Sequence, residues 1–178
     1  RDTFAINYGS KTYSGDMPTS GSATYGIFSE ALYTEYPNAD SGSRYAVRGE
    51  GSLNANFSNN KISGSINLSS FYDYRQFLIY GATSESQIIN APIFTINFPE
   101  VSISGNSFEY DDGNFFSLTS SGGYGITGDG IAGGSFFGPD GKEISGTFLG
   151  TKSDNDTSRL YDWDIIGVFY GTCKPSGC

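Results

Sequence analysis

Residues 45–57 read Tyr-Ala-Val-Arg-Gly-Glu-Gly-Ser-Leu-Asn-Ala-Asn-Phe, and this stretch decides the fold. Its odd-numbered positions, from Tyr45 to Phe57, carry aromatic, aliphatic or glycine residues, whereas its even-numbered positions are mainly polar. Successive side chains of a β-strand point to opposite faces of the sheet. The period of two therefore predicts a long strand with one face toward a core and the other toward water.

The residues that follow predict a hairpin. Residues 58–60, Ser-Asn-Asn, have the chemistry of a tight turn. A second alternating run comes next, and its apolar or glycine positions are Ile62, Gly64, Ile66 and Leu68. Glycines on the dry face of both runs are expected where strands of a barrel bend sharply.

Similar alternation recurs along the rest of the chain, and no segment shows helical periodicity over three turns. It predicts further strands at residues 22–34, 93–98, 101–105, 126–137, 143–149 and 164–171. The segment Gly138-Pro139-Asp140-Gly141 joins two of them as a turn. Eight strands in one run favour closure, which leaves no exposed edge. We therefore expect an all-β fold, an eight-stranded antiparallel up-and-down barrel.

Two aromatic-rich segments, residues 69–92 and 106–125, interrupt the alternation. Long segments of this kind in compact domains are usually functional loops or disordered, and the aromatic content argues against disorder. Two interpretations remain from the sequence. The aromatic side chains lie on functional loops, or some of them plug the barrel or form another short strand.

Composition disfavours several classes of function. Ten Lys and Arg against 19 Asp and Glu give a net charge of −9, which disfavours binding to nucleic acid or to an anionic membrane surface. The chain has no histidine, so catalytic triads, zinc sites and haem sites that depend on histidine are excluded. No apolar run is long enough for a transmembrane helix.

Carboxylates are the best remaining catalytic candidates, and we expect no enzyme from them. The two acid groups are Asp111 with Asp112, and Asp154, Asp156, Asp162 and Asp164. Adjacent aspartates ahead of a glycine more often begin turns than form the opposed pair of a glycosidase. The second group lacks the glycine and glutamate positions of a calcium loop. We expect no metal and no cofactor.

The two cysteines, Cys173 and Cys178, lie at the C-terminus with Lys-Pro-Ser-Gly between them. A disulfide across this short turn is sterically reasonable and typical of an oxidising compartment, and free thiols are the alternative. The chain begins at Arg1 rather than at Met. This start is typical of a chain from which an upstream signal has been removed, together with any lipid-anchored cysteine.

Three segments resemble a known family. Residues 17–25, Met-Pro-Thr-Ser-Gly-Ser-Ala-Thr-Tyr, resemble the entry into the C-lobe barrel of transferrin-binding protein B. Residues 134–148, Gly-Ser-Phe-Phe-Gly-Pro-Asp-Gly-Lys-Glu-Ile-Ser-Gly-Thr-Phe, are similar to its late hairpin, and residues 166–171, Ile-Gly-Val-Phe-Tyr-Gly, to its closing strand. The three segments follow one another in the order of that family.

The resemblance implies the eight-stranded barrel of surface lipoproteins and secreted hemophilin-like proteins of Gram-negative bacteria, located at the outer membrane or outside the cell. A handle sheet usually precedes such a barrel, and here only residues 3–8 offer a strand for it. We therefore expect a truncated or reduced handle with its linker at residues 1–20, the barrel at 21–172 and a disulfide-closed tail at 173–178.

The resemblance also implies a non-catalytic protein that captures a host protein, such as an iron or haem carrier or another host factor. Aromatic side chains on loops at one barrel end would supply the contact area. Our candidates are Tyr33 and Tyr36 on the first loop, Phe71, Tyr72, Tyr74 and Phe77 on the long loop, and Arg75 for a bidentate contact. The acidic surface favours a basic face on the partner.

Two other functions remain open. The barrel could carry a small ligand, either an apolar molecule or haem, whose axial ligand would be a tyrosine or Met17 in the absence of histidine. Alternatively, it is a support module within a larger surface lipoprotein.

Overall fold

The computed structural model describes residues 10–38, 41–81, 87–88, 93–119, 125–152 and 162–174, and in a few strand and helix segments the backbone alone. Eight long strands make up most of it. They are β1 (Ser22–Asn38), β2 (Ser41–Asn56), β3 (Lys61–Asp73), β5 (Ile93–Ser104), β6 (Ser107–Thr119), β7 (Gly125–Phe137), β8 (Glu143–Lys152) and β9 (Asp162–Cys173). The short elements are η1 (Ser14–Asp16), α1 (Tyr74–Tyr80), β4 (Gln87–Ile88) and η2 (Pro139–Gly141).

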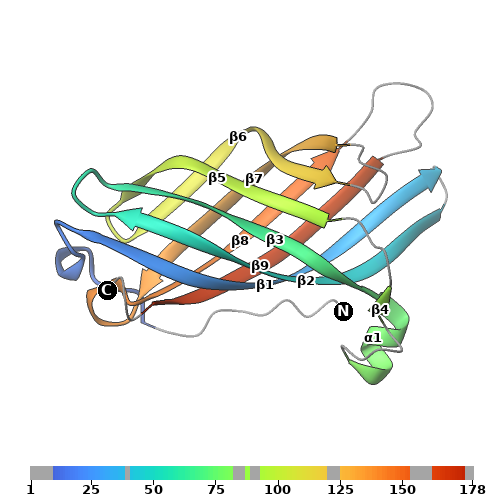
Figure 1. Ribbon diagram of the computed structural model, residues 1–178, viewed down its shortest axis with the longest axis horizontal. Coiled ribbons are helices and arrows are strands. Elements are labelled where there is room, and N and C mark those ends of the chain that lie inside the picture. The colour runs from blue at the N-terminus through green and yellow to red at the C-terminus, as the bar shows by residue number, and fades with distance from the viewer. Residues whose placement is uncertain are drawn as a thin grey trace.

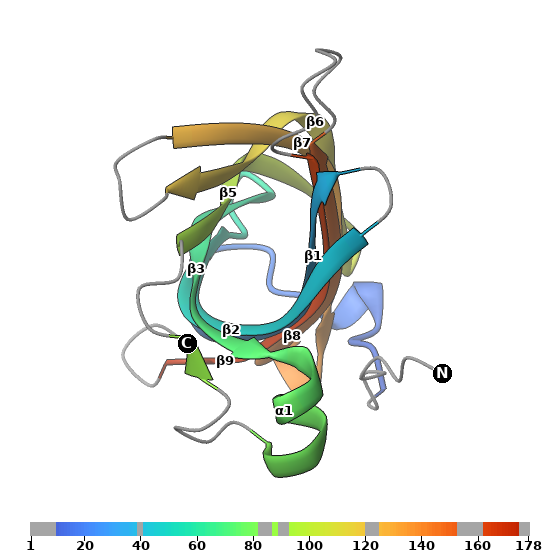
Figure 2. The ribbon, with the colours of Figure 1, turned by 90° about the vertical axis from the view of Figure 1, so that its right-hand side faces the viewer.

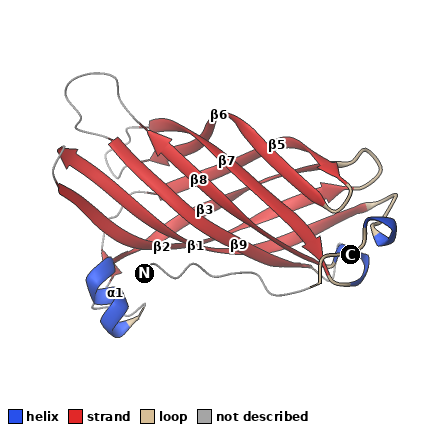
Figure 3. Ribbon diagram, turned by 180° about the vertical axis from the view of Figure 1, so that it is seen from behind, coloured by secondary structure: helices blue, strands red, loops and turns tan. Residues whose placement is uncertain are grey.

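The long strands form a closed ring. Each pairs antiparallel with the next long strand along the chain, and β1 pairs with β9 to close the sheet. The two-residue strand β4 only extends the end of β3. The strands cross the barrel at a tilt (Figures 1 and 3), and the end view shows the ring (Figure 2). The predicted eight-stranded antiparallel up-and-down barrel is confirmed.

The strand boundaries differ from the prediction at two places. The predicted strands at residues 93–98 and 101–105 are one strand, β5, which passes through Pro99 with a shift in register against β3 and β6. Residues 107–119, predicted as part of a loop, form β6. Phe108 points inward and Glu109 outward there, so the alternation was present but short. The structure joins two predicted strands into one and adds one strand that was not predicted, so the number of long strands is still eight.

The structure also differs from the prediction within residues 69–92. β3 continues to Asp73, and the chain then forms the helix α1, which was not predicted. The two-residue strand β4 comes later in the same segment. β4 contains no aromatic residue, so it is not the aromatic short strand that the sequence left open as an alternative. Phe71 points into the barrel with 2% of its surface exposed, which confirms that part of this aromatic segment plugs the interior.

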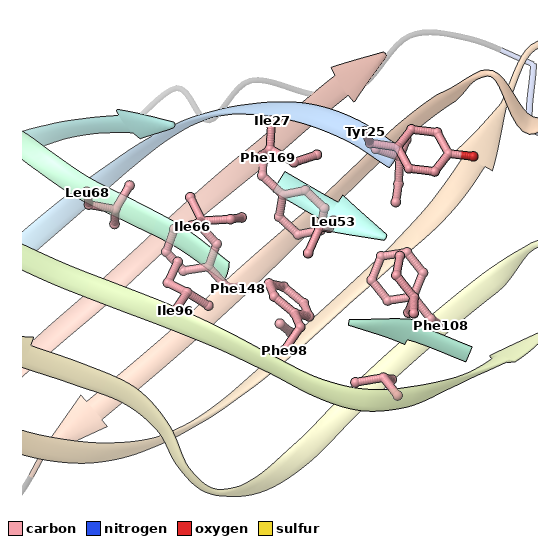
Figure 4. Packing of buried hydrophobic residues seen from close by; sticks show 14 of the residues in the cluster. Tyr25, Ile27, Leu53, Ile66, Leu68, Ile96, Phe98, Phe108, Phe148 and Phe169 are labelled. Atoms are coloured by element: carbon pink, nitrogen blue, oxygen red, sulfur yellow. The ribbon is translucent and has the colours of Figure 1, made fainter. Parts of the chain in front are cut away.

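The barrel interior is filled by buried aromatic and aliphatic side chains (Figure 4). Several of the rings lie over inward-facing glycines. A Cβ atom on Gly167 would lie 2.4 Å from Cζ of Phe148, and one on Gly146 would lie 2.5 Å from Cζ of Phe169. Eight strands enclose an interior just wide enough for side chains to fill. Large rings fit in this space because the residues opposite them have no side chain.

Glycines also coincide with the irregularities of strand pairing, as the sequence suggested. The register between β2 and β3 shifts between Arg48 and Gly49, and the register between β3 and β5 shifts between Ile62 and Gly64. Gly64 has a φ of 150°. A shift of this kind bends the strand and increases its twist, which helps the sheet close.

The segments that carry the family resemblance meet at one end of the barrel. The hydroxyl of Tyr25 donates a hydrogen bond of 2.6 Å to the carbonyl oxygen of Gly141, and Met17 packs in the same core cluster. Burial raises the pKa of Tyr25 above its ordinary value. Gly141 has a φ of 65° and lies against Met17, so the turn requires a residue without a side chain. This packing holds the segment of residues 17–25 against the turn of residues 138–141, although the two are far apart in the sequence.

The described part of the N-terminal segment, from Ser10, covers that end (Figure 2). The backbone N–H of Thr12 donates to the carbonyl oxygen of Phe136 at 3.0 Å, and its hydroxyl donates to Gly138 at 2.7 Å. Asn106 donates to the carbonyl oxygen of Thr12. The predicted handle strand at residues 3–8 lies outside the described residues, so the predicted domain boundaries stay predictions.

Cys173 is the last residue of β9 and is half-buried beside the core. Its predicted disulfide partner, Cys178, lies outside the described residues. No cysteine within the described part of the chain is free. The pairing itself stays a prediction.

We predict that Gly167→Ala lowers the free energy of unfolding by about 1–3 kcal/mol, because the added methyl group would overlap Phe148 and force the core to shift. The matched control is Gly133→Ala on the outer face of β7, where the nearest atom is the carbonyl oxygen of Phe108 at 3.4 Å. We expect the control to stay within about 0.5 kcal/mol of the unmodified protein.

Urea unfolding followed by the fluorescence of the single tryptophan, Trp163, measures both variants, since this residue is buried. Equal stability of the Gly167 and Gly133 variants would show that the inward glycines are not needed to accommodate the rings.

Candidate functional site

Helix α1 lies outside the barrel, at the end away from η1 and η2 (Figure 1). It continues directly from β3 and contacts the outer surface of β2 and β3. Asp73 begins the helix, because its carboxylate accepts the backbone N–H groups of Arg75 and Gln76, both at 3.0 Å. A carboxylate that satisfies these N–H groups stabilises a helix start. Gly81 ends the helix with a φ of 73°.

An arginine of the barrel wall anchors the helix. The guanidinium of Arg48 lies 5.2 Å from the ring centroid of Phe77, and Phe77 also packs against Tyr72 at 5.8 Å. On its other side, Arg48 forms an ion pair of 2.5 Å with Glu30 of β1. A helix of seven residues is too short to be stable alone. The contacts of Phe77 with Arg48 of β2 and Tyr72 of β3 therefore hold α1 against the wall.

The outer side of the helix presents large apolar side chains to water. Leu78 and Ile79 are 66% and 69% exposed. Arg75 and Gln76 are also exposed, whereas Tyr72, Tyr74 and Phe77 are half-buried. Adjacent exposed aliphatic residues on a helix held by a rigid sheet are typical of a contact surface. We call Tyr72, Tyr74, Arg75, Phe77, Leu78 and Ile79 the α1 surface.

A hollow of about 640 Å³ lies beside this surface. It is lined by Ser43, Arg44, Tyr45, Asp73, Tyr74, Arg75 and Leu78. Arg44 and Arg75 thus bring two guanidinium groups to a hollow that also has aromatic and aliphatic walls. Planar guanidinium groups form bidentate contacts with carboxylates and stack on aromatic rings. The hollow can accept a protruding side chain of a partner.

Four of the predicted contact residues, Tyr72, Tyr74, Arg75 and Phe77, are brought together on α1 and the end of β3. Tyr36 pairs through its backbone with Asp162 in the wall, and its side chain is not among those described. Its predicted contact role stays a prediction.

Tyr33 and Phe71 belong to the core and not to the exposed surface. They are 4% and 2% exposed, and both rings pack against Phe94, at 4.8 Å and 6.0 Å between centroids. Phe94 in turn packs against Trp163 at 5.2 Å. Burial, with a smaller effect from Glu35 and Tyr45, raises the pKa of Tyr33. We therefore leave Tyr33 and Phe71 out of the contact surface.

Three residues of this region, Arg44, Leu78 and Ile79, were not predicted from the sequence. Arg44 occupies an outward position in the alternating run of β2, which looked like an ordinary solvent-facing charge. The start of the helix had a signal in Asp73, whose residue type is favoured at this position. However, the helix is too short for hydrophobic periodicity, so the exposure of Leu78 and Ile79 was hidden in the sequence.

The described part of the chain lacks two kinds of feature. None of its helices is both long and apolar enough to cross a membrane. No cluster of three or more metal-ligating side chains occurs there. Of the carboxylates weighed as catalytic candidates, Asp111 lies exposed on β6 and Asp164 lies half-buried on β9, whereas Asp154 and Asp156 lie outside the described residues.

The family can now be assigned. The model of the C-lobe and N-lobe beta barrels of Tf-binding protein B matches residues 17–172. The chain belongs to this family. The match begins at the buried Met17 and ends one residue before Cys173, so it covers the eight long strands except for the last residue of β9. The comparison with curated proteins gives no match.

The chain is similar to several solved structures, and the first of them supports the fold. The structure of intact Ap-TbpB has a TM-score of 0.53 at 16% identity, over 93% of this chain and 28% of that one. Transferrin binding protein B of serogroup B Neisseria meningitidis has a TM-score of 0.46 at 16% identity, over 92% and 28% of the two chains. A double mutant of the Haemophilus parasuis Hp5 protein has a TM-score of 0.49 at 18% identity, over 93% and 28%. The chain thus spans under a third of these proteins.

We predict that Phe77→Ala loosens α1 without unfolding the barrel, because it removes the contacts with Arg48 and Tyr72. A cation–π contact at a partly exposed site contributes about 0.5–1 kcal/mol, in addition to the loss of apolar burial. Backbone amides of residues 75–80 should exchange with solvent at least several-fold faster, as measured by hydrogen exchange. Ile79→Ala, which alters an exposed side chain of the same helix, should leave these rates unchanged. Equal rates in the two variants would contradict the anchoring role of Phe77.

Proposed function

We propose that this barrel is a non-catalytic binding domain on the surface of a Gram-negative bacterium, and that it captures a host protein such as an iron or haem carrier through the α1 surface. The observation that carries the proposal is the pair of exposed aliphatic residues, Leu78 and Ile79, on a helix anchored to a closed barrel. The family comprises the barrels of Tf-binding protein B, and this supports an iron carrier as the partner.

The chemistry of the α1 surface fits protein recognition. Tyrosine and arginine are enriched among the residues that contribute most to protein–protein binding. Tyr72 and Tyr74 offer aromatic area with few rotatable bonds, and Arg75 and Arg44 offer guanidinium groups beside an apolar wall. Because α1 is held by Arg48 and the Asp73 cap, little conformational freedom would be lost on binding.

The small-ligand interpretation has less support. The interior of the barrel is occupied by buried aromatic and aliphatic side chains (Figure 4). Met17, considered as a haem ligand, is 9% exposed and packs against Gly141. Tyr25 is buried and its hydroxyl donates to the same turn. These residues stabilise the closed end of the barrel, so we keep the capture of a protein as the proposed function.

We predict that Leu78→Ser with Ile79→Ser weakens capture of the host protein about tenfold or more, because two apolar contacts would be lost at the centre of the interface. The matched control is Tyr13→Ser, which removes a 75% exposed aromatic residue beside η1, at the other end of the barrel. The domain is used to enrich proteins from host serum, and the captured protein, identified by mass spectrometry, is then titrated against each variant.

The double variant should keep the melting temperature of the unmodified domain, since both side chains are exposed. Equal affinity of the double variant and the Tyr13 control would refute the α1 surface. Enrichment of no serum protein at all would refute the capture function and favour the support-module interpretation.

A further inference from the structure

The charges of the barrel are divided between two walls. Strands β5–β9 together contain eight acidic residues and a single basic one, Lys152. By contrast, the three arginines of the described residues, Arg44, Arg48 and Arg75, lie on β2 and α1. The wall formed by β5–β9 is therefore strongly acidic, and the α1 surface is locally basic.

An apolar strip crosses this acidic wall on its outer face. Ile131 of β7 lies directly opposite Leu149 of β8, and Leu149 lies directly opposite Ile166 of β9. Their exposed fractions are 43%, 40% and 38%. Directly opposed side chains on neighbouring strands contact one another. The three aliphatic residues thus form one continuous exposed strip across three strands.

The strip borders a shallow groove of about 930 Å³. Its lining includes the serines Ser102, Ser104 and Ser107 on the side of β5 and β6. Gly133 and Val168 also line the groove, and Val168 is only 8% exposed although its side chain is on the outer face. The small residues hollow out the wall, so the groove can hold side chains that project from a partner.

Carboxylates surround the groove and the strip. Glu109 lines the groove, and Asp111 lies directly opposite Ile131 on the neighbouring strand. Asp129 precedes Ile131 by two residues and Asp164 precedes Ile166 by two, so all four carboxylates share the outer face with the strip. Glu109, Asp111 and Asp129 are exposed. Such a fringe attracts cations and repels anions.

We infer that this groove is a second binding surface, separate from the α1 surface, for a polypeptide segment in which aliphatic side chains alternate with lysine or arginine. The aliphatic side chains would cover Ile131, Leu149 and Ile166, and the cations would face Glu109, Asp111 and Asp129. Charge decides against two such grooves facing each other in a symmetric pair, because their carboxylates would be brought together. A segment that carries both basic and aliphatic side chains would match the carboxylates and the apolar strip of the wall.

A synthetic peptide of alternating lysine and leucine serves as the probe, and fluorescence anisotropy of a label on it measures binding to the intact chain. Two further peptides, of alternating glutamate and leucine and of alternating lysine and serine, test the charge and the apolar side chains separately. We expect the lysine–leucine peptide to bind at least about tenfold more tightly than either of the others, since each loses one of the two attractions.

The triple variant Ile131→Ser, Leu149→Ser and Ile166→Ser should weaken binding of the lysine–leucine peptide about tenfold or more. Asp111→Asn with Asp129→Asn should weaken it several-fold, and less so in high salt, because exposed charges are screened. The matched control, Leu78→Ser with Ile79→Ser on the α1 surface, should bind the peptide as the unmodified protein does. Circular dichroism confirms that each variant is folded.

Equal binding of the lysine–serine peptide would show non-specific charge attraction and overturn the proposal. So would unchanged binding by the triple variant, or a loss in the α1 control as large as in the triple variant. Sedimentation that shows the unmodified chain as a dimer and the triple variant as a monomer would assign the strip to self-association instead. The α1 control also separates this proposal from the capture function, since each concerns a different wall.

Discussion

The packing of inward aromatic rings over inward glycines is the constraint on which the rest of the structure depends. A small barrel has little interior space, and Phe148 and Phe169 fit there because Gly167 and Gly146 leave room on the opposing strands. This arrangement fills the interior and allows β1 to reach β9 and close the sheet. Since the core is complete in itself, functional surfaces are left to the outside of the wall.

The two outer surfaces follow from which residues remain outside. On β2, Arg48 faces outward and holds α1 through Phe77, and the helix presents Leu78 and Ile79 to water. On the opposite part of the ring, aliphatic and acidic residues of β6–β9 form a grooved wall. One face is locally basic and the other is acidic, so the two favour partners of opposite charge. A rigid barrel keeps both surfaces in fixed positions.

The sequence predicted those features that depend on local alternation. The hairpin of β2 and β3, the turn at residues 138–141 and the closed topology all follow from a period of two and from turn chemistry. The bounds of β5 and β6 were not predicted correctly from the sequence. Pro99 interrupts the alternation within β5, and the alternation around Phe108 of β6 is short. Pairing with the neighbouring strands stabilises β5 and β6 as strands, although the alternation in their own sequences is interrupted or short.

The candidate site was predicted in part. Tyrosine and phenylalanine occur both in the core and on the surface, so composition could not distinguish Tyr33 and Phe71, which are buried, from Tyr72 and Tyr74. That distinction depends on where β3 ends and α1 begins, which Asp73 sets through its hydrogen bonds. The groove on β5–β9 could not be predicted from the sequence, because it depends on the strand register that places Ile131, Leu149 and Ile166 side by side.

Hydrogen exchange of the domain alone and bound to its captured serum protein tests the central claim most directly, because it reports where the partner sits without any substitution. We expect slower exchange at residues 43–48 and 74–81, where α1 lies against β2, and unchanged exchange around η1 at residues 13–17. Protection confined to the η1 end, with α1 exchanging as in the free domain, would contradict this expectation.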